Sequence, residues 1–173
     1  MQKQVLFIQG AGEGAYELDG VLSAYLQDAL GPEYDVLYPE MPNEGEPDYG
    51  TWKVQIEEFL SRLNGEVILV GHSVGGSVLL KYLTHEKVTN HITGVLLIAP
   101  PYDESVLPEA SSLKFDQLPR MFFYHSRDDE IVPFSHLTFF AEKLPKAAIR
   151  KFDGRGHQFC NDLSEVVMDI KGL

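Results

Sequence analysis

Short apolar runs alternate with longer amphipathic stretches along this chain. The runs suited to buried strands are residues 5–9, 35–38, 66–70, 94–99, 121–125 and 147–152. The stretches with helical periodicity lie at 15–30, 50–63, 74–86, 133–144 and 162–171. Strands and helices that alternate in this way favour parallel pairing, because each crossover must return over one face of the sheet. The pattern predicts an α/β protein, a three-layer α/β/α sandwich in a single domain over residues 1–173.

Two segments between the predicted elements are longer than a typical connection. Residues 39–49 are rich in Pro, Glu, Gly and Asn, and residues 100–119 contain prolines, serines and acidic residues. Long loops at the carboxyl ends of parallel strands usually shape a binding site. We therefore expect both segments to border the functional site.

Composition narrows the choice of partner and compartment. A net charge of −12 argues against nucleic acid or an anionic membrane surface as a partner, because either would require a basic patch. Small neutral or cationic ligands are easier to accommodate. The single cysteine, Cys160, excludes an internal disulfide and fits a reducing compartment. The N-terminal apolar run is too short for a secretory signal, and no segment reaches the roughly 18 apolar residues of a membrane span. We expect a cytoplasmic protein, and the oligomeric state stays open.

A G-x-S-x-G pentapeptide lies where a predicted strand meets a predicted helix. It occupies residues 71–75, directly after the apolar run 66–70. Such a turn lifts the serine out of the sheet, and its glycines are needed because side chains would collide across the bend. Ser73 is therefore a candidate nucleophile. The pentapeptide alone is a weak signal, so the assignment depends on finding the partners of the serine.

A serine hydroxyl needs a base, and the base needs an acid that orients it. In the hydrolase fold built on this turn, the acid follows the serine in the chain and the histidine comes last. Asp128, Asp129 and Glu130 follow the strand predicted at 121–125. An acid four residues before Pro133 resembles the D-x-x-V-P pattern of hydrolases, and this register selects Asp129, with Asp128 as the alternative. The other two acids are expected to favour the dipole of the next helix.

His157 is the candidate base. It follows the last predicted strand and lies in a loop with Gly154 and Gly156, which allow the tight bend that leaves the ring at the edge of the sheet. His72 is next to Ser73, but its side chain is expected to point away and to pack or bind a loop. Because the histidines lack H-E-x-x-H or paired-cysteine spacing, we expect no metal and no cofactor. Cys160 is expected to be buried or to cap a helix.

Acyl transfer also requires hydrogen-bond donors for the oxyanion. One is expected to be the backbone N–H of Val74, at the start of the helix after the serine, and the other an N–H of the loop after the first strand. In that loop Ala11 is the first choice and Gly12 the second. Residues 10–15 also fit G-x-G-x-x-A, a fingerprint of dinucleotide sites, with Glu40 as the acid for the ribose. That alternative leaves Ser73 and its partners without a role.

At these motifs the chain resembles the α/β-hydrolase superfamily, and within it the small lid-less serine hydrolases of the retinoblastoma-binding protein 9 and YdeN type. The resemblance is carried by residues 71–75, 99–101, 126–133 and 154–157, and by the proline-rich segment 39–43 followed by Trp52. It implies a compact six-stranded parallel sheet, with local order 2-1-3-4-5-6 and no cap domain. One departure is that Gln9-Gly10-Ala11-Gly12 replaces the H-G-G-G type loop of larger esterases, which puts the second oxyanion donor in doubt.

The sequence therefore predicts a serine hydrolase that cleaves small or short-chain acyl esters at Ser73, Asp129 and His157. Hydrolysis is expected to rise with pH as His157 loses its proton. From their place in the loops, five residues are candidates to contact the substrate: Tyr16, Met41, Tyr102, Phe134 and Phe159. The alternatives are a hydrolase fold used as a protein-interaction module, and the dinucleotide-binding oxidoreductase. The natural substrate and the type of bond stay open.

Overall fold

Six strands form the central sheet among residues 2–109 and 117–173, which the computed structural model describes. All neighbouring pairs are parallel, in the order β2-β1-β3-β4-β5-β6. The strands are β1 (Lys3–Ile8), β2 (Tyr34–Leu37), β3 (Glu66–His72), β4 (His91–Ile98), β5 (Arg120–Ser126) and β6 (Ala148–Phe152). The predicted fold class and the strand order implied by the resemblance are both confirmed.

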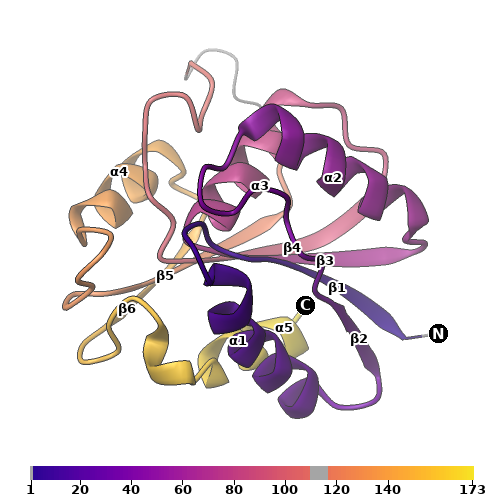
Figure 1. Ribbon diagram of the computed structural model, residues 1–173, viewed down its shortest axis with the longest axis horizontal. Helices are drawn as coiled ribbons and strands as arrows, with labels where there is room; N and C mark the ends of the chain where they lie inside the picture. Colours follow the sequence, from indigo (N-terminus) through magenta and orange to yellow (C-terminus); the bar gives the residue numbers. More distant parts are fainter. Residues whose placement is uncertain (1, 110–116) are drawn as a thin grey trace.

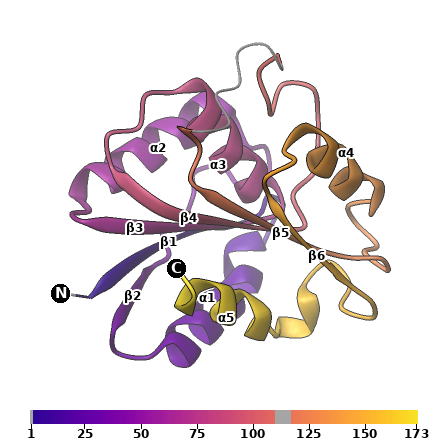
Figure 2. The ribbon, with the colours of Figure 1, turned by 180° about the vertical axis from the view of Figure 1, so that it is seen from behind.

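Helices cover both faces of this sheet (Figures 1 and 2). On one face lie α2 (Tyr49–Arg62), α3 (Val74–His85) and α4 (Ser135–Lys143), and on the other lie α1 (Ala15–Leu30) and α5 (Ser164–Lys171). Alternate side chains of each strand enter the two resulting cores. In β1, for example, Leu6 packs with the first group of helices and Phe7 with the second, and both are fully buried. Burial on both faces explains why the strands appear in the sequence as continuous apolar runs.

The element boundaries differ from the predicted ones by a few residues. Helix α2 begins at Tyr49 because the Asp48 carboxylate accepts a hydrogen bond from Thr51 N at 2.8 Å, which caps the helix. Helix α4 begins at Ser135, so Pro133 lies just before the helix and not in its first turn as expected. Pairing with β1 and β4 extends β3 through Gly71 to His72, and this brings the strand directly to the turn at Ser73.

The connections after the strands all lie at one edge of the sheet, because the strands are parallel. In the connection from β4 to β5, residues 99–109 and 117–119 carry no cap domain, and residues 110–116 lie outside the described part of the chain. None of the helices in the described residues combines the length and the apolar character that crossing a membrane requires.

Candidate active site

Ser73 occupies a strained turn between β3 and α3. Its backbone has φ 51° and ψ −127°, a conformation that L-residues rarely adopt. The flanking glycines permit the turn: a Cβ on Gly75 would lie 2.1 Å from the carbonyl oxygen of Gln9, and one on Gly71 would lie 2.6 Å from Cα of Gly76. No side chain fits at either position. The turn has the geometry predicted for the pentapeptide, and it brings the Ser73 side chain to the edge where the strands end.

His157 and Asp129 meet at the same edge. Nδ1 of His157 lies 2.9 Å from Oδ2 and 3.1 Å from Oδ1 of Asp129. The acid comes from the loop after β5 and the histidine from residues 153–158 after β6, which we call the base loop. The Asp129 side chain is fully buried and that of His157 is 11 % exposed. An acceptor on Nδ1 leaves Nε2 of His157 free to take a proton from a nucleophile.

The base loop packs against the turn that carries Ser73. The rings of His157 and His72 have centroids 4.8 Å apart, and Nε2 of His72 contacts the carbonyl oxygen of His157 at 3.1 Å. In the described residues no hydrogen bond joins the hydroxyl of Ser73 to the ring of His157. Such bonds are often long in an enzyme without substrate and tighten when substrate binds.

Asp129 is the most heavily hydrogen-bonded acid of the site. Its Oδ1 accepts from the backbone N–H groups of Ile131 at 2.9 Å and Val132 at 2.8 Å. Burial alone would raise the pKa of Asp129, but the hydrogen bonds from His125, from His157 and from these two N–H groups outweigh burial and hold the pKa far below its usual value. The acid is therefore ionised throughout the working range of an enzyme.

A second histidine, His125, contacts the far side of the same carboxylate. It lies at the end of β5, is fully buried, and places Nε2 3.2 Å from Oδ2 of Asp129 and 2.9 Å from the carbonyl oxygen of Val132. A carbonyl oxygen only accepts, so Nε2 carries the hydrogen. Nδ1 has no hydrogen-bond partner in the described part of the chain, as suits a ring nitrogen without a hydrogen.

The acids on either side of Asp129 hold the base loop, which differs from the helix-dipole role expected for them. Oδ1 of Asp128 accepts from Gly154 N at 2.9 Å and from Gly156 N at 3.3 Å. Oε2 of Glu130 accepts from the backbone N–H of His157 at 3.1 Å. The two side chains therefore fix the backbone that carries the histidine, while Asp129 alone reaches its ring.

The hydrogen bonds of residues 9–14, here called the oxyanion loop, distinguish between the two candidate donors. Gly10 N donates to Oδ2 of Asp19 at 2.7 Å, and Gly12 N donates to the carbonyl oxygen of Glu44 at 2.7 Å. Both N–H groups are therefore occupied. Within the described residues neither the N–H of Ala11 nor that of Val74 donates to such an acceptor, and both residues are partly exposed. The pattern favours Ala11 over Gly12.

Glu44 occupies the place that a dinucleotide phosphate would need. Its carboxylate accepts from Gly14 N at 2.7 Å and Tyr16 N at 2.8 Å, at the start of α1, and from Nε2 of Gln9 at 2.7 Å. In a dinucleotide site these N–H groups of the helix N-terminus bind the pyrophosphate. Here a side chain of the protein neutralises them, which argues against the oxidoreductase alternative.

The five candidate substrate contacts fall into two groups. Tyr16, Tyr102 and Phe134 are partly exposed near the ends of the strands. Tyr102 is held in place because its N–H donates to Nδ1 of His136 at 2.7 Å. Met41 and Phe159 are each 1 % exposed and belong to the hydrophobic cores, and Met41 also lines a cavity together with Glu13 and Asn43. Substrate contact stays a prediction for all five residues.

The turn after His157 also corrects the expectation for Cys160, which is exposed. Phe159, Cys160 and Asn161 have φ values of 53°, 50° and 55°, a left-handed turn in the short helix η2 (Phe159–Asn161). Left-handed backbone in residues with a Cβ costs roughly 1 to 3 kcal/mol each. The turn directs Phe159, two residues after His157, into the core and so anchors one end of the base loop.

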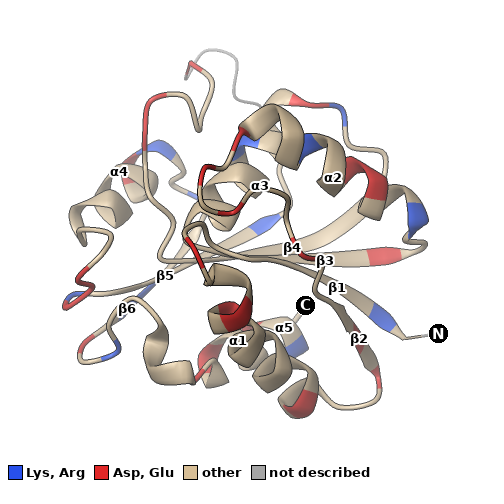
Figure 3. Cartoon of the chain, in the orientation of Figure 1, with Lys and Arg blue, Asp and Glu red and all other residues tan. Residues whose placement is uncertain are grey.

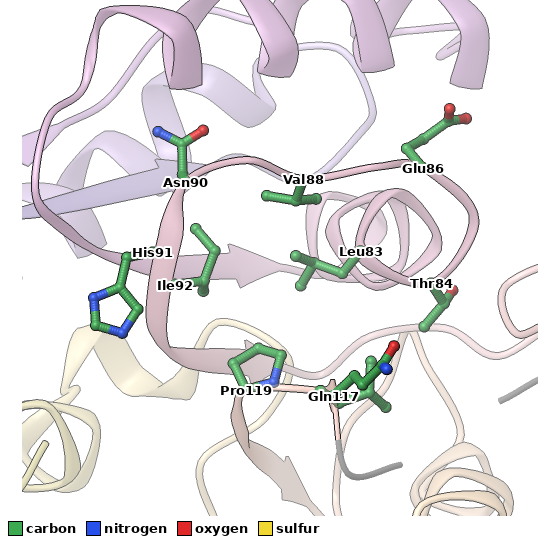
Figure 4. Close-up of a pocket in the computed structure, with 10 residues that line it drawn as sticks. Leu83, Thr84, Glu86, Val88, Asn90, His91, Ile92, Gln117 and Pro119 are labelled. Atoms are coloured by element: carbon green, nitrogen blue, oxygen red, sulfur yellow. The ribbon is translucent and has the colours of Figure 1, made fainter. Parts of the chain in front are cut away.

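Two hollows need to be distinguished from each other. A cavity of about 480 Å³ near the start of β4 includes Leu83, Asn90 and Pro119 in its lining (Figure 4). It lies away from Ser73, and the amide of Asn90 is already bonded to the carbonyl oxygen of Leu60. A second cavity of about 560 Å³ includes Glu13 of the oxyanion loop and Asn43 in its lining. Only the second borders the candidate site.

No group of three or more His, Cys, Asp or Glu in the described residues is placed to hold a metal ion.

The parallel sheet in this order, with a serine at the sharp turn after β3, defines an α/β hydrolase. Residues 24–161 match the family described as Serine hydrolase, and the chain belongs to that family. YdeN of Bacillus subtilis (strain 168) is 28 % identical in an alignment that covers 91 % of this chain and 86 % of YdeN. These matches confirm the resemblance to YdeN-type proteins, and the protein is a hydrolase.

Solved structures agree on the fold. The crystal structure of the ydeN gene product from B. subtilis has a TM-score of 0.77 and 23 % identity, and the match covers 99 % of this chain and 98 % of that one. Est1E from Butyrivibrio proteoclasticus, with ferulic acid bound, has a TM-score of 0.73 and 15 % identity, over 98 % and 87 % of the two chains. At these identities the similarity extends to the fold alone.

Proposed function

We propose that the protein hydrolyses small acyl esters, with Ser73 as nucleophile, His157 as base and Asp129 as the acid that orients the base. The observation that carries the proposal is the Asp129–His157 hydrogen bond of 2.9 Å, formed beside a strained turn that presents a serine. The serine hydrolase family and the order Ser, Asp, His along the chain support the same assignment.

The reaction proceeds through an acyl-enzyme. Oγ of Ser73 attacks the ester carbonyl while Nε2 of His157 takes the hydroxyl proton, and the negative charge on the carbonyl oxygen is stabilised by the N–H groups of Ala11 and Val74. Collapse of this intermediate breaks the ester bond, and the proton passes from His157 to the departing alkoxide. Water then attacks the acyl-enzyme by the same route, which releases the carboxylic acid and restores Ser73.

The surroundings of the site favour small neutral or cationic substrates. The β4–β5 connection carries no cap domain in residues 99–109 and 117–119, so long acyl chains find little surface to cover them. The charged side chains of the described loops after the strands are mostly acidic (Figure 3). The acids are Glu13, Glu40, Glu44, Glu46, Asp48, Asp103, Glu104, Glu109, Asp128, Asp129, Glu130 and Asp153, and the bases are Arg127 and Arg155. Anionic substrates would meet unfavourable potential here.

The test combines covalent labelling with turnover. Wild type is expected to react with a fluorophosphonate probe at Ser73 and to hydrolyse p-nitrophenyl acetate. Ser73→Ala should lose both reactions, while Ser61→Ala, on the exposed face of α2, should keep both. Failure of Ser73 to label in the correctly folded wild type would favour the interaction-module alternative. Equal turnover by wild type and Ser73→Ala would refute the mechanism.

A further inference from the structure

A second histidine–carboxylate pair lies directly behind the candidate site and has no part in the steps above. Nδ1 of His72, the residue before Ser73, is 2.9 Å from the carboxylate of Asp19 on α1. The two side chains are 3 % and 2 % exposed. A buried pair of this kind destabilises the fold unless its hydrogen bonds are complete, so the contacts of both side chains define what the pair does.

The contacts of His72 require two hydrogens on its ring. Nε2 faces the carbonyl oxygen of His157 at 3.1 Å, and a carbonyl oxygen only accepts, so Nε2 is a donor. Nδ1 faces carboxylate oxygens, where a lone pair on the nitrogen would be repelled. A neutral imidazole has one N–H and can satisfy only one of these contacts. Either the ring is an imidazolium, or the carboxyl group holds the second proton.

The contacts of Asp19 decide between these two states. Besides His72, its oxygens accept from Gly10 N at 2.7 Å and from Nε2 of Gln158 at 2.8 Å. Three donors stabilise the ionised carboxylate. Burial would lower the pKa of His72, but the hydrogen bond and charge of Asp19 outweigh it and raise that pKa. Burial likewise opposes the ionisation of Asp19, and its hydrogen bonds and the charge of His72 hold its pKa below the usual value.

The pair joins the three backbone segments that the proposed reaction must align. Asp19 holds Gly10, next to the oxyanion donor Ala11, and Gln158 of the base loop. His72 holds the carbonyl of His157 itself and is covalently attached to Ser73. Gly10 fits tightly between them, because a Cβ on it would lie 3.2 Å from Cβ of Ser73 and 3.4 Å from Oδ2 of Asp19. A shift of the pair would displace donor, nucleophile and base together.

We infer that His72 is a positioning residue that resides as an imidazolium in an ion pair with Asp19, and that this pair sets the relative positions of Ser73, His157 and the N–H of Ala11. The inference rests on the proposed function for its effect on catalysis, while the charge state stands independently. The titratable groups around the ring are Asp19 from α1, the ring of His157 from the base loop, and Asp129 from the loop after β5. Tyr38 lies near Asp19.

The charge state is tested by ¹⁵N NMR of the histidine rings in the wild-type protein between pH 6 and pH 8. Both ring nitrogens of His72 are expected to remain protonated at pH 7.5. In Asp19→Asn, His72 should become neutral at that pH and the ring signals of His157 should shift. A neutral His72 in the wild type would overturn the inference. This measurement gives its result whether or not the protein turns over any ester.

The effect on catalysis is tested by steady-state kinetics, with the replacement of another hydrogen-bonded acid as the control. Asp19→Asn and His72→Gln are expected to lower kcat by about tenfold to a hundredfold with KM changed little, as misplaced groups do. The double variant should be no worse than either single variant, because the two residues act as a unit. Asp169→Asn removes another acid that is bonded to a neighbour, the hydroxyl of Tyr124 at 2.7 Å, and should lower Tm without lowering kcat.

Equal loss of kcat in Asp19→Asn and Asp169→Asn would mean that the His72–Asp19 pair has only a structural role. That result would overturn the inference that the pair positions the catalytic groups. If Asp19→Asn does not fold, His72→Gln carries the kinetic test. If the wild type turns over no substrate, the proposed function fails. The positioning part is then decided by whether the His157 ring signals shift in Asp19→Asn and stay unchanged in Asp169→Asn.

Discussion

The carboxylate of Asp129 lies between two histidine rings, 2.9 Å from Nδ1 of His157 on one side and 3.2 Å from Nε2 of His125 on the other. His157 approaches from the base loop and His125 from the end of β5. Backbone N–H groups of Ile131 and Val132 complete the set of donors. Because each donor favours the ionised form, the acid reaches His157 as a fixed negative charge, and this gives separate predictions for the acid and for its second histidine.

Replacement of the acid distinguishes Asp129 from its neighbour in the sequence. Asp129→Asn should lower kcat by about 10³- to 10⁴-fold, because an amide no longer holds His157 in the tautomer that accepts a proton. Asp128→Asn should have a much smaller effect, since in the described residues Asp128 accepts from the backbone of the base loop at Gly154 and Gly156 and from the hydroxyl of Ser126, and not from the ring of His157. Kinetics with p-nitrophenyl acetate measure both. A larger loss in Asp128→Asn would transfer the acid role to Asp128.

Replacement of the second histidine, His125, is expected to lower stability more than it lowers the rate. His125→Leu leaves the carbonyl of Val132 without the donor at 2.9 Å and removes one donor from Asp129, both in the interior. The free energy of unfolding should fall by about 1 to 3 kcal/mol, as for an unpaired buried acceptor. Urea titration measures this change. The amide of His125→Gln is a donor of similar reach, so this variant should recover part of the lost stability. If His125→Gln and His125→Leu lose the same free energy of unfolding, the effect comes from packing and not from the hydrogen bond.

The fold was predictable because the apolar runs mark strands that are buried on both faces, and the turn residues at 71–75 mark the serine. Asp129 and His157 followed from their place after strands. The supporting contacts were not predictable, because Asp19 and His72 are 53 positions apart and their contact depends on how α1 packs on the sheet. A signal was present nonetheless. Asp19 lies in the buried stripe of α1, with Ala15, Leu22 and Leu26, where an acid needs a partner.

The same pair predicts how stability depends on pH. The pKa of His72 is raised above the unfolded value of 6.5, so its contribution is complete below that pH and is lost as pH rises through the folded pKa. The pKa of Asp19 is lowered from 3.8, so its contribution is present above that pH and is lost as pH falls through the folded pKa.

The difference in unfolding free energy between wild type and Asp19→Asn should therefore be largest from pH 4 to pH 6.5 and decrease on either side. Denaturant titrations at pH 3, 5.5 and 9 measure it. A difference that stays constant over this range would contradict a charged pair.

Glu44 is expected to matter for both stability and rate. Glu44→Ala removes the acceptor of Gly14 N, Tyr16 N and the amide of Gln9, and so frees the start of α1 and loosens the oxyanion loop. We expect a loss of about 1 to 3 kcal/mol in stability, from unpaired donors. The loss of kcat should exceed that of Glu46→Ala, an exposed acid two residues further on.

Wild-type Tm should not rise with NAD or NADP, and a clear rise would restore the dinucleotide alternative.

The acidic loops around the site should select substrates by charge. Acetylcholine and 3,3-dimethylbutyl acetate have nearly the same shape, but only the first is cationic. At low salt kcat/KM should favour the cation by about threefold to tenfold, and the preference should fade in 0.5 M NaCl, where the screening length is only a few ångströms. Glu13 and Glu40 line the cavity beside the oxyanion loop, so Glu13→Gln and Glu40→Gln should each weaken the preference. Glu57→Gln, on the exposed side of α2, should not. A preference that persists in high salt, or that all three variants reduce equally, would mean that the local acids do not determine it.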